Sequence, residues 1–124
     1  MAEPEKKITE AELEVMQVLW ASQEPMTLGQ IKAAMEGRNG DTTKTLLRRL
    51  CQKGAVGQEK RDVFYYRSLV GQQELGQYRT QRLIDKLYAG SAKAMVAAMV
   101  EHDQLSPQDV QELRELFQTL WEET

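Results

Sequence analysis

Apolar residues recur at helical spacing in two stretches near the start of the chain. Thr9 is predicted to cap the first helix, and Glu12 three residues later completes a capping box. The apolar face of this helix consists of Leu13, Met16, Val18, Leu19 and Trp20. Glu24-Pro25 ends it. Thr27 is predicted to cap a short second helix that ends near Gly37, with Gln30 at the position that completes its capping box.

A third helix is predicted after a turn at Arg38-Asn39-Gly40, with Asp41 or Thr42 as its cap. Its apolar face consists of Leu46, Leu47 and Leu50. Lys44, Arg48 and Lys53 are assigned to positions off that face, and Arg49 lies beside it. Gly54 ends the helix because glycine adopts the left-handed conformation that a helix C-terminus requires.

A β-hairpin is predicted directly after this helix. Residues 55–59 form the outgoing strand, Lys60-Arg61-Asp62 the turn, and residues 63–67 the returning strand with one Val, one Phe and two Tyr. A basic helix followed by a basic hairpin is the pattern of a winged helix-turn-helix. The predicted fold class is therefore mainly α with a small β-hairpin, with a winged helix-turn-helix DNA-binding domain over residues 1–70.

Three more helices are predicted over residues 71–89, 92–101 and 107 to the C-terminus. Ser106 and Pro107 form the cap and first position of the last one. Three short helices with wide apolar faces bury little against one another, so we expect a second copy to cover them and residues 71–124 to build a homodimer. The residues expected at this interface are Leu83, Leu87, Met95, Met99, Leu113, Leu116, Phe117 and Leu120.

Charge divides the chain in the same way. The net charge is −3. Residues 41–67 hold seven Lys or Arg and three Asp or Glu, so their net charge is +4. Residues 71–124 hold five Lys or Arg and nine Asp or Glu, so their net charge is −4. This asymmetry indicates a cationic surface for DNA on the third helix and hairpin, and a different task for the acidic second part.

The cationic surface supplies the candidate contacts. Side chains at the start of a recognition helix reach base edges, whereas cations further along hold phosphates. Base contacts are expected from Thr42, Thr43 and Lys44. Backbone contacts are expected from Arg48, Arg49, Lys53, Lys60, Arg61, Tyr66 and the helix cap at Thr27. The alternatives are a solvated basic face, or an ion pair of Arg48 or Arg49 with Glu12 or Glu14.

Few other residues in the sequence suggest a redox, metal or catalytic site. The single Cys51 excludes an internal disulfide framework and is expected to pack as a small hydrophobe rather than to act as a thiol sensor. Met95 and Met99 are expected in the dimer core rather than at a Cu(I) site, and His102 has no second histidine to complete a metal site. No catalytic motif appears, so we expect no enzyme, cofactor or metal. With no apolar run near ~20 residues and no secretory signal pattern, we expect a cytoplasmic protein outside the membrane.

Four segments resemble the penicillinase repressor family, which includes methicillin-resistance repressors and copper-responsive repressors of Gram-positive bacteria. They are ITEAELEVMQVLW, TTKTLLRRLCQKGAV, VFYYRSLV and LIDKLYAGSAKAMVAAMVE, and the resemblance extends over residues 8–122. It implies a dimeric winged-helix repressor that binds a palindromic operator and controls resistance or transport genes. It also favours positions 42 and 44 as base contacts.

The sequence departs from the pattern of the family at two places, and both concern the signal that relieves repression. In the β-lactam-responsive members a sensor-controlled protease cuts an Asn-Phe bond in the second C-terminal helix, and the corresponding pair here is Ala98-Met99. The copper-responsive members carry a C-terminal cysteine cluster, which this sequence lacks. Relief by proteolysis, ligand or metal therefore stays open, as do two other functions for the chain, a winged-helix protein-interaction module and a direct ligand or metal sensor.

Overall fold

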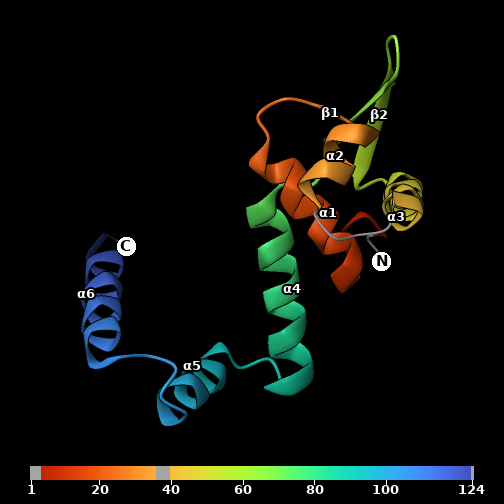
Figure 1. Cartoon of the computed structure of the whole chain (residues 1–124). Helices are drawn as coiled ribbons and strands as arrows, with labels where there is room; N and C mark the ends of the chain where they lie inside the picture. Colours follow the sequence, from red (N-terminus) through yellow and green to blue (C-terminus); the bar gives the residue numbers. More distant parts are fainter. Residues whose placement is uncertain (1–3, 36–39, 124) are drawn as a thin grey trace. The chain divides into compact units, whose positions relative to one another are not determined.

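The computed structural model describes residues 4–35 and 40–123 (Figure 1). The expected turn at Arg38-Asn39 and the expected helix end near Gly37 lie outside the described residues. Contacts divide the chain into two compact units, residues 1–79 and 80–124. The first unit contains η1 (Pro4–Lys6), α1 (Glu10–Ala21), β1 (Met26–Thr27), α2 (Leu28–Ala34), α3 (Gly40–Lys53), β2 (Val56–Lys60), β3 (Phe64–Ser68) and the start of α4 (Gln72–Leu87). The second contains the end of α4, α5 (Ala92–Glu101) and α6 (Pro107–Glu123).

Both predicted capping boxes are confirmed. The Thr9 hydroxyl accepts the Glu12 N–H at 3.2 Å, while a Glu12 carboxylate oxygen accepts the Thr9 N–H at 3.0 Å. Thr27 and Gln30 repeat this exchange at 3.2 and 2.9 Å. Each box satisfies two backbone donors that a helix start leaves without a partner, so α1 and α2 begin where the sequence predicts.

The core of the first unit is almost entirely apolar. Its largest contributors are Val15, Met16, Leu19, Ile31, Leu46, Leu47, Leu50, Val56 and Leu75. Val15 was missing from the expected apolar face of the first helix and is fully buried. Trp20 is only partly buried, and its indole N–H donates to the Ser68 hydroxyl at 3.0 Å and to the Val70 carbonyl at 2.9 Å. The indole therefore connects α1 to the chain that leaves β3.

The end of α3 fixes where the hairpin begins. Gly54 has a φ of +83°, and its N–H donates to the Cys51 carbonyl while the Ala55 N–H donates to the Leu50 carbonyl. These two bonds form a Schellman motif, which confirms the role predicted for Gly54. At the other end, α3 begins at Gly40, so Asp41 and Thr42 lie inside its first turn and neither is the cap that we expected.

Three antiparallel strands form the sheet, in the order β1-β3-β2. Lys60 pairs with Phe64, so the turn is formed by residues 61–63, one residue later than predicted. β1 was not expected as a strand, because two residues are too short to show a period; it forms by pairing Met26 with Tyr66 and Thr27 with Tyr65. The hairpin of β2 and β3 extends away from the helices of the first unit as a wing (Figure 1).

The two units meet within α4, after Arg79, whereas the sequence predicted a boundary after residue 70. The start of α4 belongs to the first unit because Leu75 is buried in its core. Two ion pairs add to this attachment, Lys6 with Glu74 at 3.3 Å and Arg79 with Glu10 at 2.6 Å.

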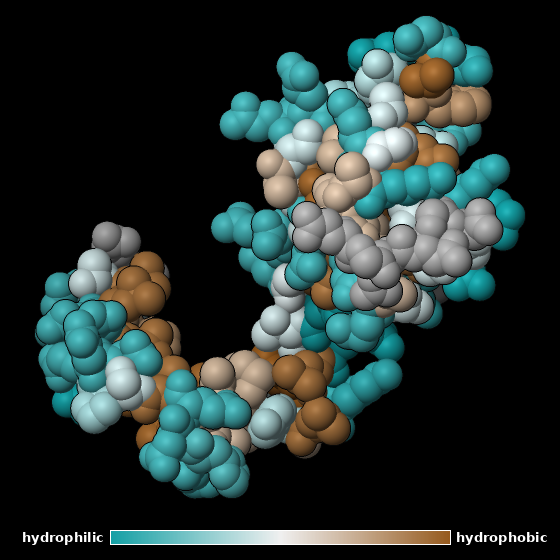
Figure 2. All heavy atoms as spheres, viewed as in Figure 1, coloured by the Kyte–Doolittle hydropathy of each residue, from teal (hydrophilic) through white to brown (hydrophobic). Residues whose placement is uncertain are grey.

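The second unit exposes most of its apolar side chains. α5 and α6 begin at the predicted residues, and Ser106 and Asp109 cap α6 reciprocally at 3.0 Å. None of the residues of α5 is buried, and Ala98 and Met99 lie half-buried inside it. Figure 2 shows apolar side chains on the surface of α5 and α6. Exposure exceeds 40% for Leu83, Leu87, Leu116, Phe117 and Leu120, whereas Met95 and Leu113 are half-buried.

None of the helices in the described residues has both the length and the apolar character needed to cross a bilayer.

Candidate nucleic-acid interface

Helix α3 buries one face in the first unit. Leu46, Leu47 and Leu50 are at most 4% exposed. Thr43 is 1% exposed as well, so the prediction that it contacts a base is wrong. Thr43 precedes the three leucines by three, four and seven residues, and this spacing places all four side chains on the same helix face. The sequence therefore contained the signal for the burial of Thr43.

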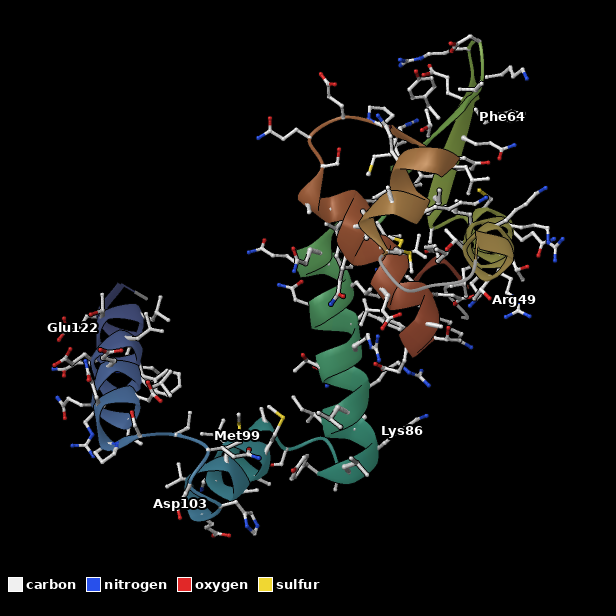
Figure 3. The ribbon with its side chains drawn as sticks, viewed as in Figure 1. Arg49, Phe64, Lys86, Met99, Asp103 and Glu122 are labelled. Atoms are coloured by element: carbon white, nitrogen blue, oxygen red, sulfur yellow. The ribbon has the colours of Figure 1, made fainter. Side chains whose placement is uncertain are left out.

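The opposite face of α3 is exposed and positively charged. Thr42, Lys44, Arg48 and Arg49 are all exposed, and Figure 3 shows Arg49 projecting from the helix. Among the described residues, no carboxylate forms an ion pair with Lys44, Arg48 or Arg49. Three exposed cations on one helix, none of them paired with a carboxylate of the described residues, can neutralise phosphates and release their counterions.

Lys53 has a different role from its neighbours. Its ammonium donates to the buried carboxylate of Glu12 and, at 2.8 Å, to the Lys7 carbonyl. The structure thus places Lys53 in a structural ion pair with α1, where we had expected a phosphate contact, and Glu12 pairs with Lys53 rather than with Arg48 or Arg49. Lys53 lies three residues after Leu50, so helical spacing places it on the buried face of α3.

The environment of Glu12 favours its charged form. Burial alone would raise the pKa of the Glu12 carboxyl, but the hydrogen bond and charge of Lys53, together with the bonds from Thr9, lower it below its ordinary value of 4.5. Glu12 is 1% exposed, so this buried charge depends on Lys53.

A groove of about 390 Å³ lies between α3 and the sheet. Its lining consists of Lys44, Leu47, Arg48, Cys51, Gln52, Gln58 and Tyr66, and includes no acid. Gln52 and Gln58 are exposed there, and sequence reasoning missed both. Gln52 follows Arg48 by four residues, so the helical period could have placed it, whereas Gln58 required knowledge of where the hairpin lies. Amide side chains can read adenine or contact phosphates.

Cys51 and Tyr66 form part of this groove and are both half-buried. Burial raises the pKa of the Cys51 thiol, so the thiol stays protonated near neutral pH, in agreement with a role in packing. Burial raises the pKa of the Tyr66 hydroxyl, and the electrostatic effect of nearby Cys51 raises it further by a smaller amount. The Tyr66 side chain packs against the core of the first unit. A phosphate contact from the Tyr66 hydroxyl stays a prediction.

The wing and α2 supply the remaining expected contacts. Lys60 and Arg61 are exposed near the tip of the wing. The Lys60 ammonium lies 4.6 Å from the centroid of the Phe64 ring, and Arg61 forms an ion pair with Glu59. The capping box occupies the hydroxyl and the N–H of Thr27, so a phosphate at this helix start would meet the N–H groups that follow Thr27.

Within residues 4–35 and 40–123, no group of three or more His, Cys, Asp or Glu side chains is arranged to hold a metal ion.

Three helices followed by a hairpin that pairs with a short third strand define a winged-helix protein. The solution structure of the DNA-binding domain of the repressor BlaI is similar, with a TM-score of 0.50 and 28% identity, and the match covers 59% of this chain and 90% of that one. The chain belongs to the penicillinase repressor family, whose model matches residues 8–119.

Individual relatives agree with this family. The chain is 30% identical over 115 residues to the penicillinase repressor of Bacillus licheniformis, and the match covers 90% of each chain. It is 30% identical over 114 residues to the methicillin resistance regulatory protein MecI of Mammaliicoccus sciuri, covering 90% of this chain and 93% of the relative. The protein is thus a DNA-binding transcriptional repressor, and its family is one of regulators rather than of enzymes.

Proposed function

We propose that this repressor acts in the cytoplasm as a homodimer on a palindromic operator and controls resistance or transport genes. Each protomer places α3 in a major groove and the wing on the adjacent backbone. The second units hold the two protomers together, so the two recognition helices lie about one helical turn of DNA apart, or a multiple of it.

One observation carries the DNA contact. Lys44, Arg48 and Arg49 are exposed and have no ion-pair partner among the described residues, on the helix face opposite the buried leucines. The acid-free groove beside them continues this surface to the wing. A structural ion-pair network would have occupied these cations, as it occupies Lys53. The relatives named for penicillinase and methicillin resistance support the proposed class of target genes.

Exposed apolar side chains support the dimer. Phe117 is 59% exposed and Leu120 is 49% exposed on a single copy of the second unit. A hollow of about 270 Å³ between α5 and α6 is lined by Val96, Val100, Leu105, Val110, Leu113, Arg114 and Phe117. Exposed apolar surface of this kind favours association, and the same surface on a second copy is a matching partner.

The hollow also supports a second candidate function, direct sensing of a small ligand. Its lining is apolar apart from Arg114, so it would favour an apolar ligand with one anionic group. In a dimer built on this surface the hollow is filled or closed, so a ligand that binds there would separate the protomers. Ligand-induced loss of the dimer distinguishes this candidate from a repressor without a direct ligand.

Selection of genomic fragments by the purified protein tests the proposed function, followed by a salt titration on the best fragment. The expected result is a palindromic site bound by two protomers, with affinity that falls steeply as salt rises. No enrichment over random DNA at low salt would contradict the proposal and would favour a winged helix that binds proteins instead.

Two lysines should separate base reading from backbone binding. Lys44→Ala is expected to weaken operator binding by about 1–3 kcal/mol and to relax base preference, because Lys44 lies near the start of α3. Lys60→Ala is expected to weaken operator and random DNA equally and to reduce the salt slope by about 1. Competition binding with operator variants measures both effects. Equal losses on every sequence for Lys44→Ala would contradict the assignment of Lys44.

A further inference from the structure

The two faces of the wing differ in what they carry. Glu59 pairs with Tyr65, and Lys60 with Phe64, so the members of each pair project from the same side of the hairpin. Lys60 shares its side with Gln58, which lines the groove beside α3. Glu59 and Tyr65 therefore lie on the side of the wing turned away from that groove.

Arg61 is attached to this outer side. Its Nη2 lies 2.7 Å and its Nε 2.9 Å from the same Glu59 carboxylate oxygen. Its guanidinium carbon lies 4.6 Å from the centroid of the Tyr65 ring, within the range of a cation–π contact. The side chains of Arg61 and Glu59 are 53% and 56% exposed, so the ion pair is in water and is weak enough to be exchanged.

We propose that Glu59 is a positioning residue of the wing, which competes with DNA phosphate for Arg61. This inference rests on the proposed function. In the free protein Glu59 and Tyr65 hold Arg61 on the outer side, while Lys60 is available on the side of the groove. A phosphate gains Arg61 only by replacing the Glu59 carboxylate, so Glu59 lowers the affinity of the wing for any DNA backbone and leaves base reading to α3.

Glu59→Gln tests this competition. The variant is expected to bind the selected operator and random DNA about 3- to 10-fold more tightly, with a steeper salt dependence. The slope should increase by about 0.9, the value for one additional phosphate contact on duplex DNA. A steeper salt dependence is expected if the variant frees Arg61 to bind a phosphate. A wing that is only better folded would bind more tightly without this change in slope.

Asp62→Asn is the matched control. It removes the same charge from the same hairpin, three residues further along, but the Asp62 carboxylate accepts the Val63 N–H at 2.9 Å rather than a bond from Arg61, and the Asn oxygen can keep that bond. Its affinity should rise less than that of Glu59→Gln, and its salt slope should stay that of the wild type. In an Arg61→Gln background, Glu59→Gln should gain no more than Asp62→Asn.

Equal effects of Glu59→Gln and Asp62→Asn, or a full gain without Arg61, would overturn the role of Glu59. Wild-type protein is measured in the same series. Operator binding by the wild type together with equal effects of the two variants would contradict only this inference, whereas failure of the wild type to bind would contradict the proposed function and this inference together.

Discussion

Phe117→Glu is expected to convert the proposed dimer into monomers and to weaken operator binding about 100-fold or more, because the second half-site contact is then no longer intramolecular. Phe117 is 59% exposed on α6 and lines the hollow against α5. On a single copy the new carboxylate stays in water, so the fold of the first unit should be unaffected. In a dimer built on this surface the same carboxylate would be moved from water into a mainly apolar interface, which is unfavourable.

Sedimentation equilibrium and an operator titration measure the two consequences of Phe117→Glu. The control is Gln118→Glu, which places the same charge on the neighbouring exposed position of α6. This control should remain dimeric and bind the operator normally, and both variants should bind an isolated half-site equally. A dimeric Phe117→Glu variant, or monomers of both variants, would contradict an interface centred on Phe117.

Lys53→Met is expected to destabilise the first unit by about 2–4 kcal/mol, because it leaves the buried Glu12 carboxylate without its cation. Lys44→Met, the same substitution on the exposed face of α3, should change stability by only about 0.5 kcal/mol or less. Urea unfolding of both variants measures this difference. At a temperature where both are folded, Lys53→Met should keep its operator affinity, whereas Lys44→Met should bind the operator more weakly, as expected for Lys44→Ala.

The loss of stability caused by Lys53→Met should depend on pH and should be smaller in acid than at neutral pH. The pKa of Glu12 is lower in the folded protein than its ordinary 4.5, so the carboxylate contributes stability above that value, and this contribution is lost as the pH falls through the folded pKa. The difference between wild type and Lys53→Met should therefore be largest near pH 7. It should shrink as the pH falls, first as Glu12 takes up a proton in the variant, where burial without the cation favours the neutral form, and then as Glu12 does so in the wild type. A difference that is constant from pH 7 to pH 3 would show that Lys53 contributes through packing alone.

Features of the chain that depend on local sequence were predicted well. The capping boxes at Thr9 and Thr27, the end of α3 at Gly54 and the start of α6 at Pro107 each depend on residues within a few positions of one another. Their partners lie within one helical turn, so side-chain chemistry and spacing decide them without knowledge of the rest of the fold.

Features that depend on distant partners were missed. β1 exists because β3 lies beside it, and no pattern in Met26 and Thr27 alone indicates a strand. The ion pair of Glu12 and Lys53 joins residues far apart in the sequence, so neither residue identifies the other. The start of α4 joined the first unit through Leu75, whose burial depends on a surface made by other elements. In the candidate interface, Lys44 and Arg48 were placed correctly off the buried face of α3, and Arg49, expected beside that face, is exposed as well. Thr43 and Lys53 required the helical period to be applied to polar residues too.

Only Gly54 and Ala55 separate α3 from β2, and the Leu69 N–H donates to the Ala55 carbonyl at 2.8 Å. So short a connection leaves the wing almost no freedom to shift along the duplex independently of the recognition helix. Transplanting α3 alone into a relative would place its side chains beside a hairpin set for another operator. A specificity transplant between family members should therefore move residues 40–68 as one cassette.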